Sequence, residues 1–143
     1  MRFIPQHYTD ITRDQAIEIT VPLHRATSSL LAINTRRNYE MELTILFLSV
    51  FTSGGLWVLL SAALPKIAGW CGAIFTTVTT GLILYQQMLG PKHKVPEIYN
   101  LYQEIGKELS SLRGTSHFNC TLFWDRYKFF EFQLDKLENP IVR

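Results

Sequence analysis

Two long apolar runs occupy the middle of the chain, at residues 43–64 and 67–89. They are 22 and 23 residues long, and Lys66 is the only charged side chain between residues 43 and 89. A bilayer core of roughly 30 Å needs about 20 residues of helix, so each run is long enough to cross a membrane once. Because only Pro65 and Lys66 separate the runs, the pattern predicts a tight hairpin of two transmembrane helices.

The segment before the first run is also predicted to be helical. Thr12 and Gln15 have the spacing of a capping box, which would begin a short helix that runs to about Thr20. Pro22 is expected to end that helix and to start another. Helical spacing then continues without interruption, which predicts one long helix over residues 23–64.

The segment after the second run is expected to form two helices. Gly90 and Pro91 end the apolar helix, Pro96 suits the first turn of the next one, and Gly114 fits its C-terminal cap. The first of these helices has an apolar stripe of Ile98, Leu101, Tyr102, Ile105, Leu109 and Leu112. The second has a coiled-coil-like seam of Phe123, Tyr127, Phe130, Leu134 and Leu137.

These elements define the predicted fold, an all-α membrane protein. Residues 1–42 form N-terminal cytoplasmic helices that include part of the long helix, residues 43–89 form the transmembrane hairpin, and residues 90–143 complete a cytoplasmic helical bundle. Trp124, Phe129 and Phe132 lie partly off the seam of the last helix, and surplus apolar surface of this kind usually marks contact with another chain. We therefore expect a homo-oligomer whose interface includes the seam residues Phe123, Tyr127, Phe130, Leu134 and Leu137.

Charge sets the expected orientation and narrows the choice of partners. The chain has 14 Lys and Arg against 12 Asp and Glu, with no clustered basic stripe, so no direct nucleic-acid partner is expected. The N-terminus has no apolar core of a signal peptide. Basic residues flank the outer ends of both runs, which places both termini in the cytoplasm of an inner (plasma) membrane protein. The residues expected to anchor it at the membrane surface are Arg36, Arg37, Lys92 and Lys94.

Small and hydroxylated residues lie along both apolar runs. One interpretation is that they pack the hairpin and its neighbours, because helices in lipid associate through close contact of small side chains. The other is that several subunits turn them inward to line a narrow pore. Neither run contains Asp, Glu, Arg or His, so a pump or coupled carrier is not expected. The candidates are Ser49, Ser53, Gly69, Ala73, Thr76, Thr77 and Thr80.

The residues give no indication of an enzyme, a metal or a cofactor. The four histidines are far apart, and Cys71 and Cys120 are interpreted as packing residues. Arg113 and His117 loosely resemble the Arg–His motif of HEPN ribonucleases, but their spacing is too short and Gly114 interrupts the helix. Asn119 lies in a glycosylation pattern that would go unused on a cytoplasmic tail. No catalytic residue is therefore expected.

The layout resembles the SLATT group, small two-span proteins of prokaryotic conflict systems. The resemblance lies in a helix ending in Arg36-Arg37-Asn38-Tyr39, an abrupt hairpin, and an amphipathic helix with Tyr99 and Tyr102. The layout is also similar to two-span membrane accessory proteins of RNA-targeting CRISPR loci. The resemblance implies an oligomeric antiviral effector that permeabilises or depolarises the inner membrane, triggered by a cytoplasmic sensor protein or a nucleotide second messenger. A membrane-anchored scaffold without a pore is the alternative.

Overall fold

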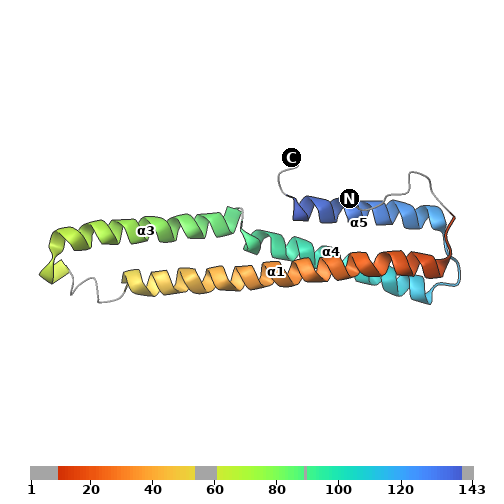
Figure 1. The fold of residues 1–143 in the computed structure, drawn as a ribbon, viewed down its shortest axis with the longest axis horizontal. Helices are drawn as coiled ribbons and strands as arrows, with labels where there is room; N and C mark the ends of the chain where they lie inside the picture. The colour runs from red at the N-terminus through yellow and green to blue at the C-terminus, as the bar shows by residue number, and fades with distance from the viewer. Residues whose placement is uncertain (1–9, 54–60, 89, 140–143) are drawn as a thin grey trace. The chain divides into compact units, whose positions relative to one another are not determined.

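The computed structural model describes residues 10–53, 61–88 and 90–139, and all regular structure in these ranges is α-helical. The helices are α1 (Arg13–Ser53), α3 (Pro65–Met88), α4 (Pro91–Gly114) and α5 (Cys120–Glu138) (Figure 1). The expected all-α class is therefore confirmed for these residues. The helices form two compact units: a three-helix unit of Met1–Ala32 with Pro96–Arg143, and a helix-pair unit of Ile33–Val95.

The start of α1 confirms the predicted capping box. The Thr12 N–H donates to Gln15 Oε1 at 2.9 Å, and the Gln15 N–H donates to Thr12 Oγ1 at 3.4 Å. Each side chain thus satisfies a backbone donor that the first helical turn leaves without a partner.

The predicted break at Pro22 is wrong, because α1 continues through it as one helix. Ala16, Thr20, Leu23 and Thr27 are all buried, and their spacings of 4, 3 and 4 place them on one face. A proline inside a helix costs about 3 kcal/mol. Burial of the same face on both sides of the exposed Pro22 offsets that cost, so packing overrides the local signal.

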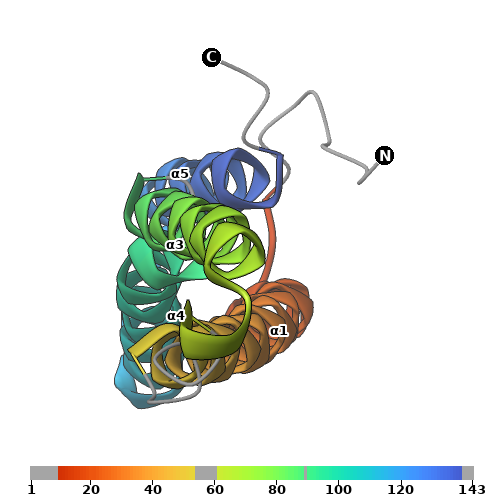
Figure 2. The ribbon, with the colours of Figure 1, turned by 90° about the vertical axis from the view of Figure 1, so that its left-hand side faces the viewer.

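The three-helix unit is held together by two adjoining apolar clusters. One contains Leu23, Leu101, Ile105, Phe130 and Leu134, and the other contains Ala16, Leu112, Phe123 and Trp124. The α4 stripe is confirmed, since five of its residues are buried and the sixth, Tyr102, stacks on His24 with ring centroids 4.5 Å apart. The first part of α1, α4 and α5 run lengthwise beside one another (Figures 1 and 2).

Two helix starts differ from the prediction. Pro65 and Lys66, the expected turn, are the first residues of α3, and α4 begins at Pro91 rather than at Pro96. Both starts have proline at the first helical position, where its missing N–H is not needed. Asn119 has a structural role that its sequence did not suggest: its side chain caps α5 by accepting the Leu122 N–H at 3.2 Å.

In the helix-pair unit, α3 runs antiparallel to the second part of α1. Phe51 and Phe75 meet with ring centroids 5.4 Å apart, and Gln86 donates to Asn38 Oδ1 at 3.1 Å. The face of α3 that turns toward α1 contains Ala68, Phe75, Thr79 and Gln86, at spacings of 7, 4 and 7. Residues 54–60, which include part of the first predicted span, lie outside the described residues.

The junction between α3 and α4 requires glycine at position 90. A Cβ added there would lie 2.6 Å from Gln86 Cα and 3.0 Å from its carbonyl oxygen, which are backbone atoms that cannot rotate away. We expect Gly90→Ala to destabilise the protein by about 1–3 kcal/mol through overpacking. Thermal unfolding of the purified chain, followed by circular dichroism, measures the change.

Gly106→Ala is the matched control for this prediction. A Cβ at Gly106 would meet His24 Nε2 at 3.5 Å, an ordinary contact, so this substitution should stabilise α4 by about 0.5–1 kcal/mol. Equal effects of the two substitutions would contradict the close approach at Gly90.

Candidate functional site

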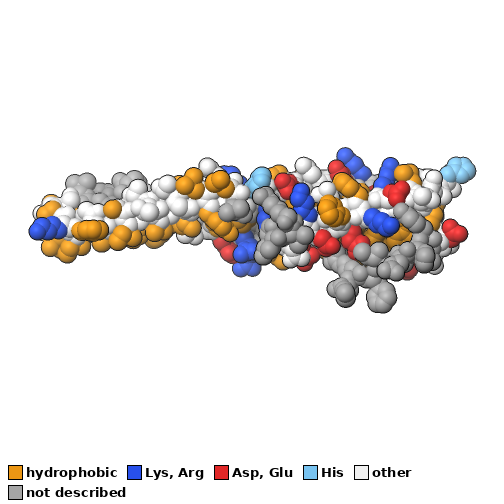
Figure 3. All heavy atoms as spheres, turned by 90° about the horizontal axis from the view of Figure 1, so that it is seen from above, with side chains coloured by type: hydrophobic (Ala, Val, Ile, Leu, Met, Phe, Trp, Pro, Cys, Tyr) orange, Lys and Arg blue, Asp and Glu red, His pale blue; other side chains and the backbone are white. Residues whose placement is uncertain are grey.

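The outer surface of the helix-pair unit is strongly apolar. Trp70 is 75% exposed and Met88 is 72% exposed, although both belong to residue types that are normally covered. In the space-filling view, hydrophobic side chains extend along this unit with few charges among them (Figure 3). The other exposed large apolar residues of the unit are Ile33, Tyr39, Leu43, Leu46, Phe47, Val50, Leu64, Ile67, Ile74, Val78, Leu84 and Tyr85.

Among the described residues, one segment within the range Pro65–Gly114 is long and apolar enough to cross a membrane. Only 11% of that segment is buried inside the chain. The core helix of a soluble protein would be mostly buried, so an apolar segment this exposed needs another covering.

Three faces of α3 have different compositions. The first, already described, turns toward α1. The second is bulky, with Ile67, Ile74, Val78 and Tyr85 at spacings of 7, 4 and 7, all exposed. The third contains Gly69, Ala73, Thr76 and Thr80, which are also exposed.

The candidate small residues of α3 are exposed, so within the chain they do not pack α3 against α1. A Cβ added at Gly69 would meet nothing within 4 Å. The Thr76 and Thr77 hydroxyls each donate to a carbonyl of α3 at 2.8 Å, to Gly72 and Ala73 respectively, so they need no water. Thr77 lies four positions after Ala73 and three before Thr80, so it borders the small face on the side of α3 away from α1.

Sequence reasoning missed Thr79 and Gln86, the polar residues that do face α1. Their spacing of 7 from each other, and of 4 and 11 from Phe75, could have identified them as one side of the helix. Ser49 of α1 is half-buried, and the side chain of Ser53 lies outside the described residues.

A group of polar side chains lies at the end of the helix-pair unit where α3 ends and α4 begins. Asn38, which accepts from Gln86, also donates to Glu42 Oε1 at 3.2 Å, and the Lys92 Nζ lies 3.9 Å from the same oxygen. Arg36 Nε donates to Glu40 Oε1 at 2.9 Å. Of the four expected surface anchors, two are therefore paired within the chain.

The other two anchors lie together. Arg37 and Lys94 line one cavity of about 290 Å³, and neither forms an ion pair within the described residues. Arg37 comes from α1 and Lys94 from the first turn of α4, so the fold brings together cations that are 57 positions apart in the sequence. Sequence reasoning grouped all four anchors and did not separate these two.

The expected oligomer interface on α5 needs correction. Phe123, Phe130 and Leu134 are buried within the chain, and Tyr127 and Leu137 are half-buried against the same clusters. The seam therefore belongs to the core of the three-helix unit. The exposed apolar residues of α5 are Leu122, Phe129 and Phe132.

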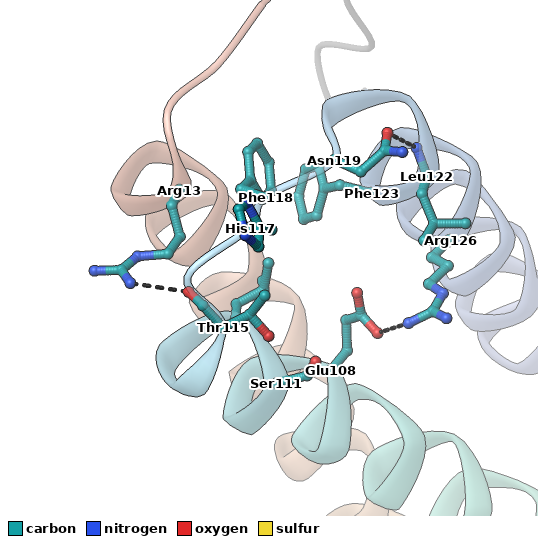
Figure 4. Close-up of a pocket in the computed structure, with 11 residues that line it drawn as sticks. Arg13, Glu108, Ser111, Thr115, His117, Phe118, Asn119, Leu122, Phe123 and Arg126 are labelled. Atoms are coloured by element: carbon teal, nitrogen blue, oxygen red, sulfur yellow. Dashed lines mark hydrogen bonds and ion pairs between the residues drawn. The ribbon is translucent and has the colours of Figure 1, made fainter.

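A pocket of about 210 Å³ lies between the end of α4 and the start of α5 (Figure 4). Arg13, at its edge, donates to the Thr115 carbonyl at 3.2 Å, and Arg126 pairs with Glu108. His117 lines the pocket, but Arg113 is not among the lining residues. The pocket therefore does not assemble the Arg–His pair of the ribonuclease motif.

The cysteines and the possible metal ligands are the remaining candidates for chemistry. Cys71 and Cys120 are half-buried and form no disulfide. Within residues 10–53, 61–88 and 90–139, no three His, Cys, Asp or Glu side chains lie together as metal ligands would. No protein-family model, curated protein or solved structure matches the chain.

Proposed function

We propose that this protein is an oligomeric inner-membrane effector that permeabilises or depolarises the membrane. In this proposal residues 43–64 and 67–89 form a two-span hairpin and both termini lie in the cytoplasm. The activity is the opening of a conduit, so it requires no catalytic residue, metal or cofactor. The observation that carries the proposal is the uncovered apolar surface of the helix-pair unit, above all on α3.

Lipid is the covering that best suits the bulky face of α3. Lipid tails are as apolar as a leucine side chain. In lipid there is therefore no hydrophobic driving force to bury the exposed Ile67, Ile74 and Val78 inside the protein. The nearby threonine hydroxyls are bonded inside their own helix, which a lipid environment requires of every polar group. The single charged residue of α3, Lys66, lies in its first turn, where a long side chain can reach the membrane surface.

Two surfaces support assembly into an oligomer. The small face of α3 (Gly69, Ala73, Thr76 and Thr80) would allow close approach of a second helix or line a narrow channel. In the three-helix unit, Phe129 and Phe132 are exposed on α5 beside the buried seam. A two-span chain cannot enclose a pore alone, so the proposed conduit needs several copies.

A role in prokaryotic antiviral defence follows from the resemblance to the SLATT group. It implies a trigger outside the membrane, either a cytoplasmic sensor protein or a nucleotide second messenger. The exposed aromatic residues of α5 also favour a second candidate function, a membrane-anchored scaffold that recruits a cytoplasmic partner and has no pore.

Membrane potential distinguishes the two candidates. Expression of the wild type in bacteria loaded with a potential-sensitive dye should depolarise the cells. The double variant Thr76→Leu with Thr80→Leu should return the signal to near the empty-vector level, because two larger apolar side chains would close the small face. Val78→Leu is the control, since Val78 is also exposed but lies on the bulky face, and it should retain activity.

If the wild type never depolarises cells, with or without phage infection as a trigger, the scaffold function would be favoured over the pore function. Equal loss of activity in the double variant and in Val78→Leu would show that the small face does not line the conduit.

A further inference from the structure

The cavity at Arg37 and Lys94 has the composition of an anion site. Its cations come from two helices, and no carboxylate of the described residues pairs with either one. The neighbouring Arg36 and Lys92 are instead held by Glu40 and Glu42. Thus, of four cations in this region, the two without an intrachain counter-ion are those that line the cavity.

Glu40 also lines the cavity, so its negative charge must be accounted for. Its Oε1 accepts from Arg36 Nε at 2.9 Å, which balances that charge. Arg37 and Lys94 therefore leave a net positive lining. An arginine and a lysine of this kind are common ligands of phosphate oxygens, the first through its planar fork and the second as a point charge.

The cavity adjoins the apolar surface on both helices. Tyr85 lines it and is the last residue of the bulky face of α3, which continues through Val78. On α1, Thr44 lines it and lies one turn before the exposed Phe47. Tyrosine is enriched where a membrane meets water, because its ring is apolar and its hydroxyl polar.

We propose that this cavity binds the phosphate of an anionic phospholipid. Arg37 and Lys94 hold the phosphate oxygens, and the acyl chains extend along Val78 and Phe47. The proposal rests on the insertion of the helix-pair unit in a membrane, and it adds a specific lipid site to the general attraction of basic residues to headgroups.

Lipid binding to the purified full chain in detergent, measured by native mass spectrometry, tests the site. The probes are phosphatidylglycerol, phosphatidylcholine and inorganic phosphate. We expect phosphatidylglycerol to bind more tightly than phosphatidylcholine, whose choline cation would lie beside Arg37 and Lys94. Inorganic phosphate at millimolar concentration should not displace the lipid, because it lacks the apolar contacts.

Two lysines give a matched pair of variants. Lys94→Gln and Lys92→Gln remove the same charge two positions apart, but only Lys94 lines the cavity. Lys94→Gln and Arg37→Gln should each weaken phosphatidylglycerol binding about tenfold, the loss typical of a charge-assisted hydrogen bond. Lys92→Gln should weaken it less than about threefold.

Equal weakening by Lys92→Gln and Lys94→Gln would overturn the site, since the lipid would then respond to overall charge. Displacement of the lipid by inorganic phosphate would show a site for the free ion instead. A wild type that fractionates without membranes would overturn the proposed function itself. A membrane-embedded wild type with no preference for phosphatidylglycerol would overturn only this inference.

Discussion

Arginine at both position 74 and position 78 is expected to remove the protein from the membrane fraction. Ile74 and Val78 belong to the bulky face of α3, near the middle of the helix, and are 58% and 48% exposed. An arginine at the centre of a membrane helix costs about 2.5–3.5 kcal/mol on insertion scales, so two should cost about 5–7 kcal/mol. Insertion of α3 would then become unfavourable.

Extraction of membranes with alkaline carbonate, followed by immunoblotting, measures this effect. Tyr99→Arg is the control, because Tyr99 is an exposed aromatic residue of α4 in the three-helix unit. We expect it to leave the protein in the membrane pellet. If the double variant and the control fractionate alike, the bulky face of α3 does not lie in lipid.

Aspartate at position 134 is expected to unfold the three-helix unit. Leu134 is 1% exposed and lies in the cluster that α1, α4 and α5 share. An unpaired charge buried there costs several kcal/mol, a large fraction of the 5–15 kcal/mol that stabilises a typical domain. Circular dichroism should show loss of the cooperative thermal transition, and limited proteolysis should cleave α5.

Phe132→Asp is the matched control, two positions away on the exposed side of α5, where Phe132 is 66% exposed. It should retain the thermal transition but reduce the size of the assembly in mass photometry. A Leu134→Asp variant that melts like the wild type would contradict the core. An unchanged assembly size in Phe132→Asp would exclude this face of α5 as an interface.

Periodicity predicted the three-helix unit well. The α4 stripe from Ile98 to Leu112 was readable because it repeats over about four turns, and the same repeat gave the α5 seam. Periodicity does not, however, say which chain covers an apolar stripe. The seam was therefore assigned to a second subunit, whereas α1 and α4 of the same chain cover it.

Local rules were less reliable at the prolines. The rule that proline starts a helix predicted a helix start at both Pro22 and Pro96, yet both residues lie inside a helix. At Pro22 the reason is visible in the structure, since Ala16 and Leu23 are buried on either side of it. A rule about one residue cannot include the energy of packing a whole face.

The candidate site was predicted in outline but not in detail. Composition identified an apolar segment and its basic flanks. It did not separate Arg37 and Lys94 from Arg36 and Lys92. The spacing of four between Arg36 and Glu40 indicates one pair, but the pair of Lys92 with Glu42 depends on how α1 and α4 meet in the fold. Likewise, a search for small residues on α3 overlooked Gln86, which is polar, long and almost fully buried.

The amide pair of Asn38 and Gln86 has a consequence for how the helix-pair unit can move. A shift of α3 along α1 by a full helical turn, about 5 Å, would break this hydrogen bond and bring Gln86 toward Asn34 or Glu42, which lie one turn to either side of Asn38. Between such positions the buried Gln86 amide would have no partner on this face, and the cost of an unsatisfied buried amide opposes those intermediate alignments. The two helices are therefore expected to shift past each other in whole helical turns, if they shift at all, and not by smaller amounts.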